Sequence, residues 1–185
     1  MFNIRVIEAY IFCMEFKLWI ESSFNDLYQS TVLAFPKTEY RQHATDPIKI
    51  NKITWSPYLG VKTLFIKGLA QNENREYQPI VLFKNVKYHS GIDAPNLIKL
   101  HTEGKDFLLE KLSLENSDIL VNCQCKDFQW RLRHFDSVDK SLYGKDRKKY
   151  EALYRPGSAN PMEMPGMCKH IIKLMKAIKE TGLVE

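Results

Sequence analysis

Two short pairs of residues in this 185-residue chain carry the side chains that best bind transition metals. Cys123 and Cys125 form the first pair, and Cys168 and His170 form the second. Three thiolates and one imidazole are typical of a structural, tetrahedral Zn²⁺ site in which protein atoms fill every coordination position. The sequence therefore predicts one structural zinc ion. Because no position is left for a reactive water, it favours a non-enzymatic protein.

Other chemistry remains open for the same residues. Cys123 and Cys125 can be buried core cysteines, or one of them can form a disulfide with Cys168. A nucleophilic pair of Cys125 or Cys168 with His134 or His170 is a further alternative, although no orienting group or oxyanion motif accompanies it. An enzyme such as a nuclease or a deaminase is disfavoured, because the Cys-x-x-Cys pair of zinc deaminases is missing. The histidines without a companion ligand are interpreted as ordinary core or surface residues: His43, His89 and His101.

The two pairs must be positioned by a strand and a helix. A predicted strand over 119–125 ends in the first pair, and side chains two apart in a strand point the same way. The second pair follows Pro165 and Gly166 and opens an amphipathic helix that Gly182 ends. Asp127 is a candidate to accept the second ring proton of His170 or to cap a neighbouring turn.

The remaining pattern predicts an α+β fold. An N-terminal helix is expected within 16–35, ended by Pro36. Short β-branched and aromatic segments then predict a mostly antiparallel sheet with strands at 50–55, 61–69, 79–88, 97–100, 107–114 and 119–125. Polar residues 71–75 predict a hairpin loop, and 103–105 predict a tight turn. We divide the chain into a helix-and-sheet region, 1–118, and a zinc module, 119–185, packed as one unit.

The segment 126–167 is the long insert of this module, and its Pro, Gly and Asn content predicts irregular structure with a short helix at 146–154. The whole excess charge of +5 lies beyond Asn122, where 13 Lys and Arg face 8 Asp and Glu. A solvated face is the simplest explanation of such charge. The candidate residues for binding nucleic acid or a protein partner are Trp130, Arg131, Arg133, Lys145, Arg147, Lys148, Lys149, Tyr150 and Arg155.

The zinc pattern, Cys-x-Cys followed by Cys-x-His, resembles the SWIM-type zinc finger. This resemblance implies a ββα module whose first pair lies on a hairpin and whose second pair opens a helix, and it implies DNA or protein binding. The match is carried by Cys123, Cys125, Cys168 and His170 and covers the last third of the chain. The long insert departs from the short spacer expected of the family.

Residues 24–29, 41–47, 60–68 and 160–170 look like an uncharacterised family of tailed-phage proteins, particularly of marine T4-like phages. The resemblance implies a virus-encoded zinc protein that acts in the particle or in the cytoplasm of an infected bacterium. We expect a structural or assembly component of the virion that contacts other phage proteins. The alternative is an intracellular protein whose basic, aromatic insert contacts the nucleic-acid backbone.

The N-terminal sequence has no pattern of a secretory signal, and no apolar run approaches the ~20 residues that span a bilayer. We therefore expect neither secretion nor a membrane partner. The sequence leaves open whether the chain starts at Met1 or Met14, and Cys13 is left without a partner in the zinc pattern.

Overall fold

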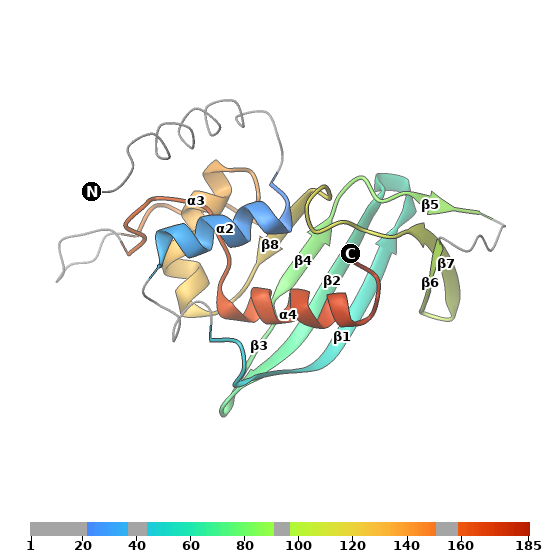
Figure 1. Ribbon diagram of the computed structural model, residues 1–185, viewed down its shortest axis with the longest axis horizontal. Coiled ribbons are helices and arrows are strands. Elements are labelled where there is room, and N and C mark those ends of the chain that lie inside the picture. Colours follow the sequence, from blue (N-terminus) through green and yellow to red (C-terminus); the bar gives the residue numbers. More distant parts are fainter. Residues whose placement is uncertain (1–21, 37–43, 91–96, 151–158) are drawn as a thin grey trace.

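The computed structural model describes residues 22–36, 44–90, 97–150 and 159–185, and Figure 1 shows how their elements are arranged. The fold is α+β, as predicted, and its sheets are antiparallel. The helices are α2 (Phe24–Ala34), α3 (Arg133–Val138) and α4 (Lys169–Glu180), with a 3₁₀ turn η3 (Leu59–Val61) and a π-helical turn η4 (Phe128–Leu132). The strands are β1 (Ile48–Tyr58), β2 (Thr63–Asn72), β3 (Arg75–Tyr77), β4 (Ile80–Phe83), β5 (Tyr88–His89), β6 (Leu97–Thr102), β7 (Lys105–Glu110) and β8 (Ile119–Asn122).

The larger sheet has the strand order β1-β2-β4-β8, with β3 paired to β2. Successive side chains of a strand point to opposite faces, and in β2 this alternation buries Leu64, Ile66, Gly68 and Ala70 on one face. Helix α4 crosses this face (Figure 1). A Cβ at Gly68 would lie 2.8 Å from Leu174 Cδ1, so the glycine allows α4 to approach the sheet closely.

Helix α4 confirms the predicted C-terminal helix. Its apolar residues are buried against the sheet, and Gly182 follows the helix with φ +78°, a left-handed conformation that suits glycine at a helix end. The C-terminal residues then pair with the segment that follows β7. The N–H of Leu112 donates to the carbonyl of Leu183, and the N–H of Glu185 donates to the carbonyl of Leu112. The buried apolar residues of α4 are Ile171, Ile172, Leu174, Met175 and Ile178.

The smaller sheet has the strand order β5-β7-β6. Its β6–β7 hairpin turns at Glu103 and Gly104, both with positive φ, which confirms the predicted tight turn. The predicted hairpin loop at 71–75 is also confirmed, because β2 and β3 pair across it. Within the described ranges, no helix is both long enough and apolar enough to cross a bilayer.

Several predicted boundaries are wrong for local reasons. The single strand expected over 79–88 is two strands in different sheets, since Asn85 adopts φ 55° between β4 and β5 and redirects the chain. The strand expected over 107–114 ends at Glu110, and the one expected over 119–125 ends at Asn122. Residues 146–150, expected to begin a short helix, are not helical, and 151–154 lie outside the described residues.

Helix α2 confirms the later part of the predicted N-terminal helix, and residues 16–21 lie outside the described ranges. It begins at Ser23, whose side chain accepts from the N–H of Asp26 while the Asp26 carboxylate accepts from the N–H of Ser23. This reciprocal capping box fixes the start of the helix. The insert departs further from prediction: it opens with η4 and α3, where irregular structure was expected.

Candidate metal centre

The first ligand pair lies where the sheet gives way to a helix. Cys123 directly follows β8, and the chain bends at Cys125 into η4. The N–H of Phe128 donates to Cys125 Sγ at 3.3 Å, and the Gln129 side-chain amide donates to the carbonyl of Cys123 at 2.6 Å. These bonds hold the bend that turns both sulfurs inward. The hairpin position implied by the SWIM-type resemblance is therefore wrong for this pair.

The second ligand pair opens α4, as predicted. Cys168 is the N-cap residue with extended backbone, φ −78° and ψ 162°, and His170 lies in the first helical turn. This change of backbone conformation between the two residues lets side chains only two apart face one point. Side chains two apart within a regular helix would diverge.

Residues from α2 and α3 hold the segment that leads to Cys168. The N–H of Gly166 donates to Asp136 Oδ1 at 2.7 Å, and the N–H of Met167 donates to Thr31 Oγ1 at 2.8 Å. Both acceptors are buried. The backbone beside the second pair is therefore fixed by two helices that are distant from it in sequence.

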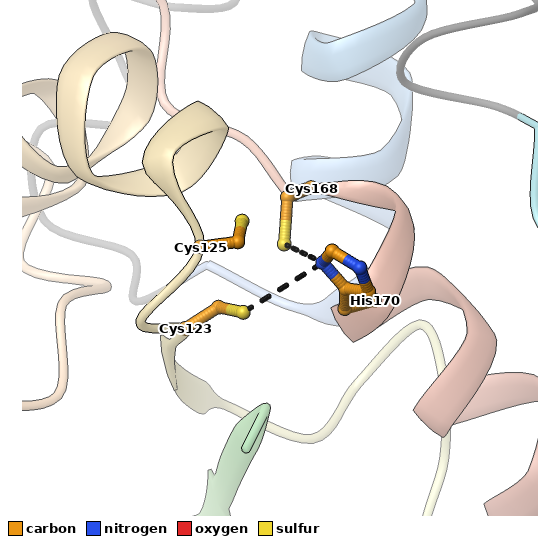
Figure 2. Close-up of side chains that lie close together, drawn as sticks. All are labelled: Cys123, Cys125, Cys168 and His170. Carbon is orange, nitrogen blue, oxygen red and sulfur yellow. Dashed lines mark hydrogen bonds between the residues drawn. The ribbon is translucent and has the colours of Figure 1, made fainter. Parts of the chain in front are cut away.

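The four predicted ligands come together in the interior (Figure 2). Their ligand atoms all lie within 4.8 Å of one another. His170 Nδ1 faces the sulfurs, 4.0 Å from Cys123 Sγ and 3.9 Å from Cys168 Sγ. Ligands of a tetrahedral zinc ion with Zn–S bonds of ~2.3 Å lie about 3.8 Å apart. The cluster therefore fits an ion of this size with only a small contraction.

The protonation of the sulfurs also points to a cation. Burial raises the pKa of the Cys123 and Cys168 thiols, whereas hydrogen bonds from these two thiols lower the pKa of Cys125. Burial therefore disfavours ionised sulfurs unless a positive charge lies beside them. A divalent cation would displace the remaining thiol protons and bind all three sulfurs as thiolates, which is how metal binding couples to thiol ionisation. The three cysteines are free, so the alternative of a disulfide with Cys168 is wrong.

His170 has a different environment from the one predicted. Tyr77 stacks on the imidazole with ring centroids 4.1 Å apart, which fixes the plane of the ring. Its Nε2 atom has no hydrogen-bond partner among the described residues. Asp127, the predicted partner, instead pairs with Arg131 Nε at 3.3 Å. The orientation of His170 therefore rests on ring stacking rather than on a carboxylate.

Several basic residues predicted to bind a partner have internal contacts. Arg131 pairs with Asp127 and lies over the ring of Phe35. Arg133 donates to the carbonyl of Lys145 and to the Gln129 side chain. These arginines link the start of the insert to neighbouring parts of the fold. Their guanidinium groups therefore already have partners within the chain. Lys149 likewise forms an ion pair with Glu163.

Three other predicted residues form a surface cluster, which we call the aromatic cluster: Trp130, Arg147 and Tyr150. The Trp130 and Tyr150 rings lie 4.6 Å apart, and the Arg147 guanidinium lies 4.1 Å from the centroid of the Trp130 ring. Trp130 and Tyr150 remain 39% and 40% exposed. Lys145 and Lys148 are exposed nearby in sequence. Arg155 lies outside the described residues.

Sequence reasoning missed Thr31 and Asp136. Thr31 occupies a buried position on the apolar side of α2, where its hydroxyl resembles any core threonine in sequence. Asp136 is fully buried on α3, an element that was not predicted. The segment 132–136 has the sequence Leu-Arg-His-Phe-Asp, so no local pattern marks this carboxylate as buried.

The remaining predicted surface histidines have local partners. His89 contacts Glu110, and His101 contacts Asp106, both on the smaller sheet. These two contacts agree with ordinary surface roles. His134, considered above only as the partner of a cysteine nucleophile, has its Nδ1 atom 3.0 Å from the carbonyl oxygen of Arg147. His43 and Cys13 lie outside the described residues.

Comparison with known proteins gives no match to a protein-family model, a curated protein or a solved structure. The resemblances to SWIM-type fingers and to tailed-phage proteins therefore stay predictions. What the geometry establishes is an α+β chain with a buried Cys₃His cluster that can hold a metal ion.

Proposed function

We propose that the chain binds one Zn²⁺ through Cys123, Cys125, Cys168 and His170, and that the ion is structural. The supporting observation is the buried cluster of four ligand atoms within 4.8 Å. Four protein ligands leave no coordination position for a substrate or a reactive water, which favours a non-enzymatic role. When bound, the ion supplies a link between the end of β8 and the start of α4.

We further propose that the protein is a structural or assembly component that acts through protein–protein contacts. The aromatic cluster supports this role, because aromatic and arginine side chains are the commonest anchors at protein interfaces. Its position supports it as well, since Trp130 lies in η4, five residues beyond Cys125. The setting that we propose, a bacteriophage particle, rests on the family resemblance alone.

Nucleic-acid binding is the second candidate. Lys145 and Lys148 favour it, because neither side chain forms an ion pair with a described residue, and exposed aromatic rings can stack on bases. The internal contacts of Arg131, Arg133 and Lys149 weaken it, since these charges would have to leave existing partners to reach phosphates. Protein recognition is therefore the function that the contacts support better.

The experiment that separates the two functions begins with the metal content of the purified, reduced chain, for which we expect one zinc per chain. Mass spectrometry of purified particles should then find stoichiometric copies of the chain, and absence from the particles would contradict a virion role. Fluorescence anisotropy with a labelled single-stranded oligodeoxythymidine is the second arm. Binding that falls steeply with salt and is lost in Trp130→Ala would favour the nucleic-acid function instead.

A further inference from the structure

A hollow of about 530 Å³ lies beside the metal centre, and this volume is in the range of small-molecule pockets. Two of the metal ligands, Cys125 and His170, form part of its wall. The rest of the wall comes from the β2–β3 hairpin, from the bend after β8 and from the first residue of α4. The hollow is therefore bounded by the same elements that position the metal ligands.

The imidazole of His170 brings an unpartnered nitrogen to this hollow. Its Nδ1 atom faces the sulfurs of Cys123 and Cys168, and Figure 2 shows Nε2 on the far side of the ring. His170 is 3% exposed, and Nε2 is buried without a hydrogen-bond partner among the residues that the structure describes. The edge of the ring that is turned away from the sulfurs is thus the edge that a ligand in the hollow can reach. Because Nε2 is itself buried, only a small group at the end of a ligand fits there.

This nitrogen requires an oxygen acceptor. When Nδ1 binds a metal ion, the neutral imidazole carries its proton on Nε2, which is then a hydrogen-bond donor. A metal-bound histidine almost always donates this second N–H to a carboxylate, a backbone carbonyl or water. No described residue supplies such an oxygen to His170, and a buried donor without an acceptor is costly. An oxygen from outside the chain is therefore expected at Nε2, a step that rests on the proposed metal centre.

Cations around the hollow favour an anionic ligand. Arg75, Lys126 and Lys169 line it, and none of the three forms an ion pair within the described ranges. Arg75 lies two residues before Tyr77 in β3, so its side chain projects from the same face of the strand as the ring that stacks on His170. Helix α4 adds the partial positive charge of its N-terminus, which has no capping side chain.

Two carboxylates also line the hollow, and they leave a net positive charge. Asp127 already pairs with Arg131 at 3.3 Å. Glu76 lies between Arg75 and Tyr77 in β3, so its side chain projects from the opposite face of the strand. With Arg131 included, four cations face these two carboxylates. A zinc ion bound by three thiolates adds one negative charge, so the surroundings of the hollow remain positive.

A phosphate group at the end of a molecule matches these features better than other anions do. A phosphomonoester carries about −1.5 to −2 charges at pH 7 and has three acceptor oxygens, enough to accept from Nε2–H and to contact cations on several sides. A carboxylate has one charge and two oxygens. Helix N-termini are common phosphate sites. The phosphodiester of a nucleic acid has only one charge, and its two ester links hinder it from reaching a buried nitrogen.

We propose that this hollow binds a terminal phosphate group, either inorganic phosphate or the phosphate of a small phosphomonoester. One phosphate oxygen accepts from His170 Nε2–H, and the cations Arg75, Lys126 and Lys169 neutralise its charge. The phosphate contacts a metal ligand and not the metal, so the ion stays structural. The inference goes beyond the proposed function, because it gives the chain a small-molecule ligand.

The test is isothermal titration calorimetry of the zinc-loaded full chain with two probes, inorganic phosphate and adenosine 5′-monophosphate. We expect at least one of them to bind with a Kd between about 1 µM and about 1 mM. Adenosine, which has no phosphate, should not bind. Binding of inorganic phosphate alone would identify the free anion as the ligand, and tighter binding of the nucleotide would identify a phosphorylated small molecule.

Two substitutions test the assignment of the cations. Arg75→Gln and Lys169→Gln each remove one positive charge and keep a side chain of similar length, so each should raise Kd about 10-fold. Lys179→Gln is the matched control, because Lys179 is exposed at the other end of α4 and does not line the hollow. This control should bind like the wild type. All three variants should keep one zinc, because neither a metal ligand nor a buried residue is changed.

Nitrogen-15 NMR of the imidazoles gives a direct readout at His170, whose Nε2–H proton should move downfield when phosphate binds. A one-zinc chain that binds neither probe at millimolar concentration would overturn this inference and leave the metal centre intact. Unchanged Kd values in both variants, or binding of labelled oligodeoxythymidine without binding of either probe, would overturn it equally. A chain without zinc would overturn the metal centre together with this inference, so the zinc content distinguishes the two failures.

Discussion

The Asp136 carboxyl is an unusual group to find in the core near the Cys₃His cluster. One oxygen accepts from the N–H of Gly166, and the other, Oδ2, has no hydrogen-bond partner among the described residues. Burial raises its pKa well above the usual range, against a smaller lowering by the Gly166 N–H. The protonated acid is thus favoured in the folded chain. Its ionisation opposes folding.

The sign of the pH effect follows from linkage. A carboxyl group whose pKa is higher in the folded state than in the unfolded state contributes most to the stability of the fold below its unfolded pKa of ~3.9. This contribution is lost as pH rises toward the folded pKa. Asp136→Asn keeps an oxygen acceptor for Gly166 but cannot ionise. We therefore expect Asp136→Asn to gain stability relative to the wild type, by about 1 kcal/mol or more, between pH 5 and pH 8.

Urea unfolding of both zinc-saturated proteins at the two pH values measures this difference. Zinc release at low pH affects both proteins alike and cancels in the comparison. A wild type that instead becomes relatively more stable as pH rises would show that Asp136 is ionised in the folded chain.

The ligands themselves give the second residue-scale prediction. Cys168→Ser removes one of four donors, and His170→Ala removes the only nitrogen, so each should lose the bound zinc. Structural zinc can supply about 10 kcal/mol of apparent binding energy at neutral pH, so we expect the melting temperature to fall by about 10 °C or more. Calorimetry and metal analysis provide the measurements. Cys13→Ser is the control and should keep one zinc, while a Cys168→Ser chain that retains wild-type melting and metal content would refute the structural role.

At the scale of elements, the contact between α2 and the segment before Cys168 is tight at Gly166. A Cβ at this position would lie 2.6 Å from Thr31 Oγ1, which also donates to the carbonyl of Leu27 at 2.7 Å and is therefore held in place. Gly166→Ala should move the segment, weaken the Met167–Thr31 hydrogen bond and cost about 2 kcal/mol of stability. It should also lower zinc affinity, because the segment positions Cys168.

Competition with a chromophoric chelator measures that affinity, and thermal unfolding measures the stability. Gly60→Ala is the matched control, since a Cβ there has nothing within 4 Å. Equal effects of the two substitutions would mean that the close contact at Gly166 does not influence the metal centre.

The elements differ in how far the sequence predicts them. The ligand set and α4 are predictable because cysteine spacing, the apolar period and a terminal glycine all indicate the same structure. The split between β4 and β5 depends on one left-handed residue, Asn85, which no periodicity reveals. Helix α3 was missed because the segment is rich in aromatic and charged residues without a clear period, and its buried Asp136 contacts Gly166, which comes 30 residues later in the chain.

The residues of the metal centre also divide into those that the sequence predicts and those that it does not. Identity of the four ligands is a matter of residue type and spacing, which the sequence carries directly. The supporting contacts from Thr31, Tyr77 and Asp136 depend on how α2, β3 and α3 pack around α4, and such contacts between distant segments leave no local pattern. Predicted partners such as Asp127 fail for this reason, because proximity in sequence does not decide which side chain faces His170.

At the scale of the whole molecule, the Cys₃His cluster joins two elements of the region 119–185, and both elements pack on the sheet strands of the region 1–118. The first ligand pair follows β8, an edge strand of the larger sheet, and the second begins α4, which crosses that sheet. Cys123, Cys125 and Cys168 belong to the same hydrophobic cluster as Leu64 and Ile66 of β2. Loss of the ion should therefore disturb the sheet together with the insert, rather than release the insert alone.

Two tryptophans allow a direct test of this coupling. Trp55 lies on β1 and packs against the core, whereas Trp130 lies in η4 at the insert. In a Trp19→Phe background, Trp130→Phe leaves Trp55 as the single emitter, on the sheet. Trp55→Phe leaves Trp130 as the single emitter, in the insert. On titration with a zinc chelator at a fixed, moderate urea concentration, we expect both emitters to change with the same midpoint, because one cooperative unit unfolds. A Trp130 transition that is complete while Trp55 emission stays native would mean that the insert opens independently. The ion would then organise only its local surface.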